Sequence, residues 1–245
     1  MPSAAHSLDQ FVRFMVLRFA PAFVGIALLI LFGAAKDLPA ADRWEGAIKA
    51  FEAKDIENPP QSGSVLFIGS SSIRMWDLAK SFPGLATINR GFGGSYLRDS
   101  THYADRIAIP YQPRAIILYA GDNDIASGIT ADELLIDFKA FEATIRKVLP
   151  ETSIIYLSIK PSVKRWDQYP EQQKANKLIA DYAKSGQRLR FVDVGTPLLG
   201  EDGKPRADLL LKDGLHLNEA GYAIWNKVLD AELKSLLAAP IKQAA

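Results

Sequence analysis

Three consecutive serines end an apolar run early in the chain. Residues 65–68 are apolar, and Gly69, Ser70, Ser71 and Ser72 follow them. A serine hydroxyl is a weak nucleophile at neutral pH, and it becomes reactive when a histidine accepts its proton and a carboxylate orients that histidine. Serine is also common in turns, so the cluster predicts a nucleophile only if such partners stand elsewhere in the chain.

Few side chains can act as that base, because the sequence has three histidines and no cysteine. His216 follows Asp213 by three residues with Gly214 between them, and one tight turn at this spacing brings the carboxylate to the imidazole. Asp99 also precedes His102 by three residues, but no glycine stands between them, and no carboxylate precedes His6. The lack of cysteine excludes a thiol nucleophile, disulfides and zinc–thiolate sites. Asp213 and His216 therefore complete a candidate triad with one of the serines.

Acyl transfer also requires hydrogen-bond donors for the oxyanion of the tetrahedral intermediate. A glycine-rich run ends at Gly94, and Asn123 stands in the run Gly-Asp-Asn-Asp that follows another apolar segment. A glycine allows close approach of a substrate to its backbone N–H. The N–H groups of Ser71 and Gly94 and the side-chain amide of Asn123 can supply the three donors.

The elements that must position these residues follow from hydrophobic periodicity. Helices are predicted around residues 44–51, over 130–148 behind a capping box of Thr130 and Glu133, over 171–184, and after Asn218. Apolar runs predict strands over residues 65–68, 86–88, 115–119, 154–159 and 189–194. Strands that alternate with helices predict a doubly wound α/β fold with a parallel sheet. The loops after the strands then meet at one edge, where we expect the candidate residues to lie together.

Four blocks of the sequence resemble those of the SGNH hydrolases, also called GDSL-type esterases and lipases. Residues 69–72 are similar to the family's Gly-Asp-Ser-Leu block, and Asn89 with Gly94 is similar to its second block. Residues 121–124 match Gly-x-Asn-Asp, and residues 213–216 match Asp-x-x-His. The resemblance covers about residues 63–235, and its nearest branch is that of platelet-activating-factor acetylhydrolase.

The resemblance implies a three-layer, flavodoxin-like fold and hydrolysis of esters or thioesters without a metal or cofactor. It implies that Ser71 is the nucleophile, that His216 is the base and that Asp213 orients His216. It also implies an oxyanion hole made by Ser71, Gly94 and Asn123. Serine stands at position 70, where the family usually has aspartate, and at position 72, where it usually has an aliphatic residue.

The N-terminus has a composition of its own. Residues 19–35 carry no charge, and Arg13 and Arg18 precede them. This pattern predicts an apolar helix within residues 1–36 that is a signal peptide or a membrane anchor, with the rest of the chain exported to the periplasmic or extracellular side. Residues 37–62 are expected to form a first helix and a linker, and residues 63–245 the hydrolase domain.

The charge balance and the site residues leave three functional classes. The formal net charge is +1, which argues against a nucleic-acid partner. The resemblance implies a small-molecule, lipid or glycan ester as the substrate. One alternative is a metal-dependent phosphoesterase that holds a divalent ion with Asp122, Asp124, Asp213 and His216. The other is a non-catalytic binding module on the same fold, because Ser70 replaces the usual aspartate.

Overall fold

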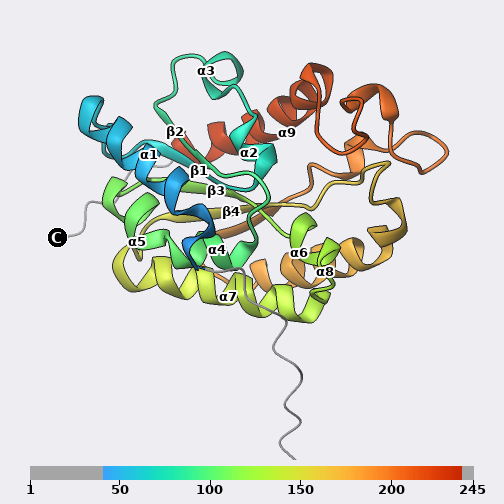
Figure 1. Ribbon diagram of the computed structural model, residues 1–245, viewed down its shortest axis with the longest axis horizontal. Coiled ribbons are helices and arrows are strands. Elements are labelled where there is room, and N and C mark those ends of the chain that lie inside the picture. Colours follow the sequence, from blue (N-terminus) through green and yellow to red (C-terminus); the bar gives the residue numbers. More distant parts are fainter. Residues whose placement is uncertain (1–40, 239–245) are drawn as a thin grey trace, which may run out of the picture. The chain divides into compact units, whose positions relative to one another are not determined.

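A parallel five-stranded sheet forms the centre of the protein (Figure 1). The computed structural model describes residues 41–238, so the predicted apolar helix within residues 1–36 lies outside the described residues. The strand order is β2-β1-β3-β4-β5, and every neighbouring pair is parallel. The strands are β1 (Val65–Gly69), β2 (Thr87–Gly91), β3 (Ala115–Tyr119), β4 (Ser153–Leu157) and β5 (Leu189–Val192). This arrangement confirms the predicted doubly wound α/β fold.

Helices cover both faces of the sheet and make three layers (Figure 1). Helices α1, α4, α5, α7 and α8 contribute buried residues to one face, and α2, α3 and α9 to the other. The helices are α1 (Glu45–Glu57), α2 (Ser71–Arg74), α3 (Leu78–Ser81), α4 (Leu97–His102), α5 (Ala104–Ile107), α6 (Asp122–Ala126), α7 (Ala131–Val148), α8 (Tyr169–Ala183) and α9 (Glu219–Ala238). Within residues 41–238, none of these helices has the length and apolar character needed to cross a bilayer.

The apolar strands are buried because each of them packs on both faces. Side chains alternate across a strand, so Val65 and Phe67 of β1 enter one core while Leu66 and Ile68 enter the other. All five residues of β1 and of β3 are buried. Continuous apolar runs of this kind are typical of central strands of a parallel sheet.

The capping signals in the sequence mark real helix ends. The Thr130 hydroxyl accepts a hydrogen bond from the Glu133 N–H, and the Glu133 carboxylate accepts one from the Thr130 N–H. The side chain of Asn218 accepts a hydrogen bond from the Gly221 N–H at the start of α9. The predicted starts of these two helices are therefore confirmed.

Two strands end earlier than predicted, because side chains replace the next backbone partners. The predicted strand over residues 154–159 ends at Leu157, and the N–H and C=O of Ile159 are bonded instead to the side-chain amide of Asn176. The predicted strand over residues 189–194 ends at Val192, and the Val194 N–H donates to the Ser158 hydroxyl. The apolar residues continue beyond both strands, which is why the sequence prediction was too long.

Strand β2 is longer than predicted, because its polar residues are satisfied inside the fold. Arg90 is buried and pairs with Asp55, and its guanidinium also donates to the Tyr111 hydroxyl over 2.9 Å. Asn89 donates to the carbonyl of Ile73. Polar side chains with such partners are tolerated in a strand. Because Asn89 and Arg90 are polar, the apolar run in the sequence ends before the strand does.

Candidate active site

The nucleophile candidate stands in a sharp turn between β1 and α2. Gly69 has φ = +137°, and a Cβ on it would lie 1.9 Å from the carbonyl oxygen of Tyr119 in the neighbouring strand. The Ser70 N–H donates to that same carbonyl over 3.0 Å. The chain therefore leaves the sheet at once, and Ser71 becomes the first residue of α2.

The three serines differ in what their hydroxyls can reach. The Oγ of Ser71 lies 2.9 Å from Nε2 of His216. Ser70 is fully buried and its hydroxyl has no hydrogen-bond partner among residues 41–238, while Ser72 is also buried. Of the three, Ser71 is the one that is hydrogen-bonded to the imidazole.

The turn of residues 213–216 holds the histidine in one orientation. Oδ1 of Asp213 accepts hydrogen bonds from the N–H groups of Leu215 (2.9 Å) and His216 (3.0 Å), and Oδ2 lies 2.5 Å from Nδ1 of His216. The bond to the imidazole, followed by the two backbone bonds, holds the pKa of the Asp213 carboxyl well below its usual range. An ionised carboxylate can only accept, so Nδ1 carries the ring proton and Nε2 of the neutral ring is free to accept from Ser71.

Two backbone donors and one amide belong to loops that are hydrogen-bonded to one another and to the turn that carries Ser71. Within residues 41–238, the N–H groups of Ser71 and Gly94 have no hydrogen-bond acceptor. Gly94 has φ = +80°, a left-handed conformation that favours glycine. The Phe92 N–H donates to the Gly69 carbonyl, which fixes this loop beside the turn that carries Ser71. Asn123 reaches the same loop, because its Nδ2 donates to the carbonyl of Ser95 over 3.0 Å.

The asparagine of the second block has a different environment. Nδ2 of Asn89 donates to the carbonyls of Ile73 (2.8 Å) and Trp76 (3.3 Å), and its Oδ1 accepts from the Gly91 N–H. These bonds connect the end of β2 with the helix that begins at Ser71. Asn89 therefore holds the nucleophile-bearing helix against the sheet.

The acidic residues of the third block do not assemble with the triad candidates into a metal site. Asp122 forms an ion pair with Arg165, with 3.1 Å between Oδ2 and Nη1. Asp124 is fully buried, and its Oδ1 accepts from the Leu97 N–H over 2.9 Å. Burial raises the pKa of the Asp124 carboxyl to about 7. In the described part of the chain, no three Asp, Glu, His or Cys side chains are grouped so that they could hold a metal ion.

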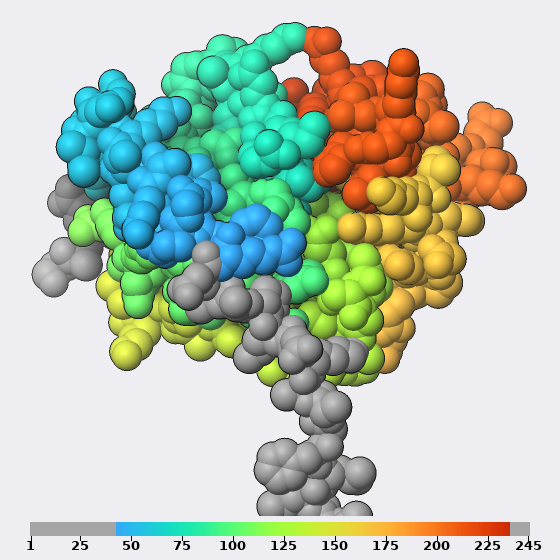
Figure 2. All heavy atoms as spheres, viewed as in Figure 1, coloured from blue at the N-terminus to red at the C-terminus, as the bar shows by residue number. Residues whose placement is uncertain are grey.

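Residues near the start of the described chain border the site, which the sequence did not indicate. The Trp44 ring lies 3.4 Å from the position that a Cβ on Gly94 would occupy, and the Arg43 guanidinium stacks on that ring with 4.6 Å to its centroid. The indole N–H donates to Asp99. Figure 2 shows the blue start of the described chain lying beside green segments that follow β2. Helical spacing predicts that Trp44 packs in the core, and no local sequence motif indicates that it also contacts the Gly94 loop.

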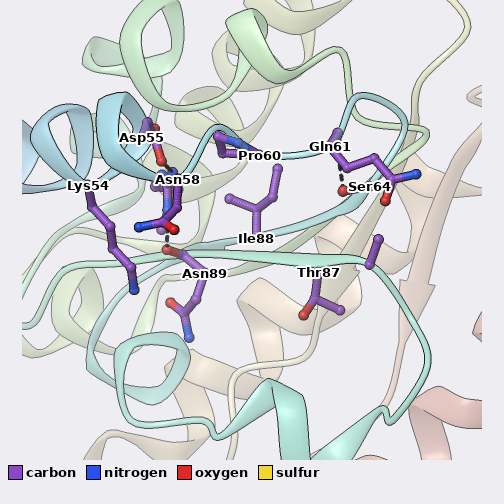
Figure 3. A pocket seen from close by; sticks show the side chains of 11 residues that line it. Lys54, Asp55, Asn58, Pro60, Gln61, Ser64, Thr87, Ile88 and Asn89 are labelled. Atoms are coloured by element: carbon purple, nitrogen blue, oxygen red, sulfur yellow. Dashed lines mark hydrogen bonds and ion pairs between the residues drawn. The ribbon is translucent and has the colours of Figure 1, made fainter.

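A hollow of about 290 Å³ lies apart from these residues, along the edge strand β2 (Figure 3). Its lining includes Lys54 and Asp55 of α1 and Thr87 of β2. None of Ser71, Asp213 and His216 lines it. The candidate chemistry therefore lies elsewhere, at the carboxyl ends of the strands, as expected for a parallel sheet.

Comparisons with known proteins agree with this architecture. The model of the GDSL-like Lipase/Acylhydrolase family matches residues 70–224, which is more than half of the chain. No curated protein matches the sequence. A structure from Streptococcus pneumonia, provisionally described as a platelet activating factor, is 25% identical with a TM-score of 0.70, over 77% of this chain and 92% of that one.

Two further structures share the fold at lower identity. A GDSL-like lipase from Bacteroides thetaiotaomicron is 20% identical with a TM-score of 0.65, over 77% of this chain and 97% of that one. A catalytic mutant of an acetylxylan esterase from Geobacillus stearothermophilus is 16% identical with a TM-score of 0.57, over 71% of this chain and 95% of that one. The chain belongs to the GDSL-like lipase/acylhydrolase family and is a hydrolase that acts on ester bonds.

Proposed function

We propose that the protein is a serine esterase in which Ser71 is the nucleophile, His216 the general base and Asp213 the residue that orients His216. The observation that carries the proposal is the continuous pair of contacts from Ser71 Oγ to His216 Nε2 (2.9 Å) and from His216 Nδ1 to Asp213 Oδ2 (2.5 Å). The two backbone N–H groups without acceptors, those of Ser71 and Gly94, support an oxyanion hole that Asn123 completes.

The reaction proceeds through an acyl-enzyme. Ser71 Oγ forms a bond to the ester carbonyl carbon while its proton passes to Nε2 of His216. The ester C–O bond then breaks, and the imidazolium returns the proton to the departing alcohol. A water molecule then attacks the acyl carbon while its proton passes to Nε2 of His216. The bond between the acyl carbon and Ser71 Oγ breaks, the imidazolium returns the proton to Oγ, and the acid is released.

A fluorophosphonate probe tests this assignment. The wild-type protein should form a covalent adduct, and Ser71→Ala should lose the adduct and cut kcat by at least about 10⁴-fold with folding intact. Ser70→Ala is the matched control, because it removes a neighbouring hydroxyl for which the described residues offer no hydrogen-bond partner. Wild-type turnover in Ser71→Ala would end the proposal. A folded wild-type protein without adduct or turnover would favour a binding module, and activity abolished by a chelator would favour the phosphoesterase.

We propose a short acyl ester on a lipid or glycan as the substrate. The names of two similar structures, which refer to a platelet activating factor and to an acetylxylan esterase, motivate this choice and the proposed branch of the family. A series of p-nitrophenyl esters tests it by chain length. Acetate and butyrate esters should have the highest kcat/KM, and a maximum at dodecanoate or longer would contradict the proposal.

We propose that residues 1–36 direct the hydrolase domain to the outer side of a membrane, as a cleaved signal or as an anchor. The support is the uncharged run 19–35 behind Arg13 and Arg18. Fractionation of expressing cells and the mass of the mature protein test this proposal. Full-length protein recovered in the cytosolic fraction would contradict it.

A further inference from the structure

Asn123 can act in an oxyanion hole only if its nitrogen, and not its oxygen, is directed to the substrate. The two ends of an amide have similar size, so the neighbours must determine the orientation. A guanidinium has donors and no acceptor. Nη2 of Arg165 lies 2.9 Å from Oδ1 of Asn123, and this contact requires the amide oxygen on the side of Arg165.

The other end of the amide is then turned to the glycine-rich loop. Nδ2 of Asn123 has two hydrogens, and one of them bonds to the Ser95 carbonyl over 3.0 Å. Ser95 follows Gly94 directly. The second hydrogen of Nδ2 is left for a ligand at the same loop, and the positive charge of Arg165 beside Oδ1 polarises the amide and makes that N–H a stronger donor.

Arg165 is itself held in place by charge. Its side chain is 16% exposed, and Nη1 lies 3.1 Å from Oδ2 of Asp122, whose side chain is 7% exposed. Asp122 also interacts electrostatically with the fully buried Lys160. Burial lowers the pKa of the Lys160 amine and Asp122 opposes that shift, so a basic group remains near Asp122 when Arg165 is replaced.

The segment that carries Arg165 also contacts the triad turn. The Lys164 N–H donates to the carbonyl of Gly214 over 3.0 Å. Val163 lies beside the same glycine, 3.4 Å from the position that a Cβ on Gly214 would occupy. Residues 163–165 thus contact both the turn that holds His216 and the amide of Asn123.

We propose that Arg165 is a positioning residue for the oxyanion hole, which fixes and polarises the amide of Asn123. The inference rests on the proposed function, because it assumes that Asn123 donates to the oxyanion. Without Arg165 only the bond to the Ser95 carbonyl orients the amide, and a rotated amide would present its oxygen to the developing negative charge. Arg165 acts through Asn123, so its contribution to kcat should vanish when Asn123 is absent.

A double-mutant cycle with p-nitrophenyl acetate tests this dependence. Asn123→Ala should lower kcat by about 10²- to 10³-fold. Arg165→Gln should lower kcat by about 10- to 100-fold with little change in KM, but by no more than about twofold in the Asn123→Ala background. Arg190→Gln is the matched control, because it also removes an arginine that pairs with a carboxylate, Glu232. It should leave kcat unchanged.

The cycle distinguishes positioning from general support of the fold. If Arg165 only supported the fold, Arg165→Gln would lower kcat by the same factor in the wild-type and Asn123→Ala backgrounds. Such additive losses of kcat would overturn the proposal. Wild-type kcat in Arg165→Gln would overturn it as well. If Arg165→Gln does not fold, Arg165→Lys replaces it with the same criterion. Ser71→Ala is measured in parallel: an active Ser71→Ala refutes the proposed function, whereas an inactive one with an additive cycle refutes only the role of Arg165.

Discussion

Replacement of the buried Asp124 by asparagine should change how the stability of the protein depends on pH. Asp124 is fully buried, its Oδ1 accepts from the Leu97 N–H, and its Oδ2 has no hydrogen-bond partner in the described part of the chain. Burial is the largest cause that raises its pKa from 3.8 to about 7, and the charges of Asp122 and Asp137 add to it. The folded protein therefore keeps a proton on this carboxyl at pH values where the unfolded chain has released it.

The raised pKa of Asp124 makes the folded protein less stable as the pH rises. Between pH 4 and pH 7 the folded state binds one more proton than the unfolded state, so the free energy of unfolding falls as the pH rises. The pKa difference from 3.8 to about 7, at about 1.4 kcal/mol for each pH unit, gives a loss of about 4 kcal/mol across this window. Asp124→Asn keeps the acceptor for Leu97 and does not titrate, so this loss should be absent.

Urea unfolding of both proteins at pH 4.5, 6 and 8 measures the difference. The stability of Asp124→Asn relative to the wild type should increase by several kcal/mol, about 3 to 4, from pH 4.5 to pH 8. Other titrating groups are common to both proteins and cancel in the comparison. Asp105→Asn, at an exposed position, is the control and should run parallel to the wild type. Parallel curves for Asp124→Asn would refute the assignment of a proton to the buried carboxyl.

Two other substitutions test how the site and its supporting helix are built. Gly69→Ala should destabilise the protein by more than about 3 kcal/mol or prevent folding, because a Cβ would meet the Tyr119 carbonyl at 1.9 Å in a left-handed conformation. Expression level and thermal unfolding measure this, and a stable, active Gly69→Ala would contradict the geometry of the turn. Thr130→Ala should cost about 1 kcal/mol, because the capping box of α7 is lost. Its kcat should be unchanged, and an altered kcat would show that the start of α7 affects the site.

The sequence predicted the layered fold and the candidate triad because both depend on local signals. Strands β1 and β3 are buried on both faces, so their residues form continuous apolar runs that can be recognised in the sequence alone. The spacing of Asp213 and His216 corresponds to a single turn with two backbone bonds to the carboxylate. These features need no knowledge of distant residues.

The remaining parts of the site depend on contacts between distant segments. Arg165 has no motif of its own, and it meets Asn123 across 42 positions of the chain. The short helices α2 to α6 have four to six residues each, too few to show a helical period. Ser71 was selected among three serines by family resemblance, whereas in the structure only its hydroxyl, of the three, is bonded to the imidazole.

Trp44 lies against the Gly94 loop although it stands outside the region that matches the family model. The region that carries the family signature begins at residue 70, yet an aromatic side chain ahead of it borders the glycine proposed to bind the oxyanion. A fragment cut at the family boundary would retain Ser71, Asp213 and His216, but it would lack this border together with strand β1. We therefore expect the segment ahead of the family region to influence which esters this protein accepts.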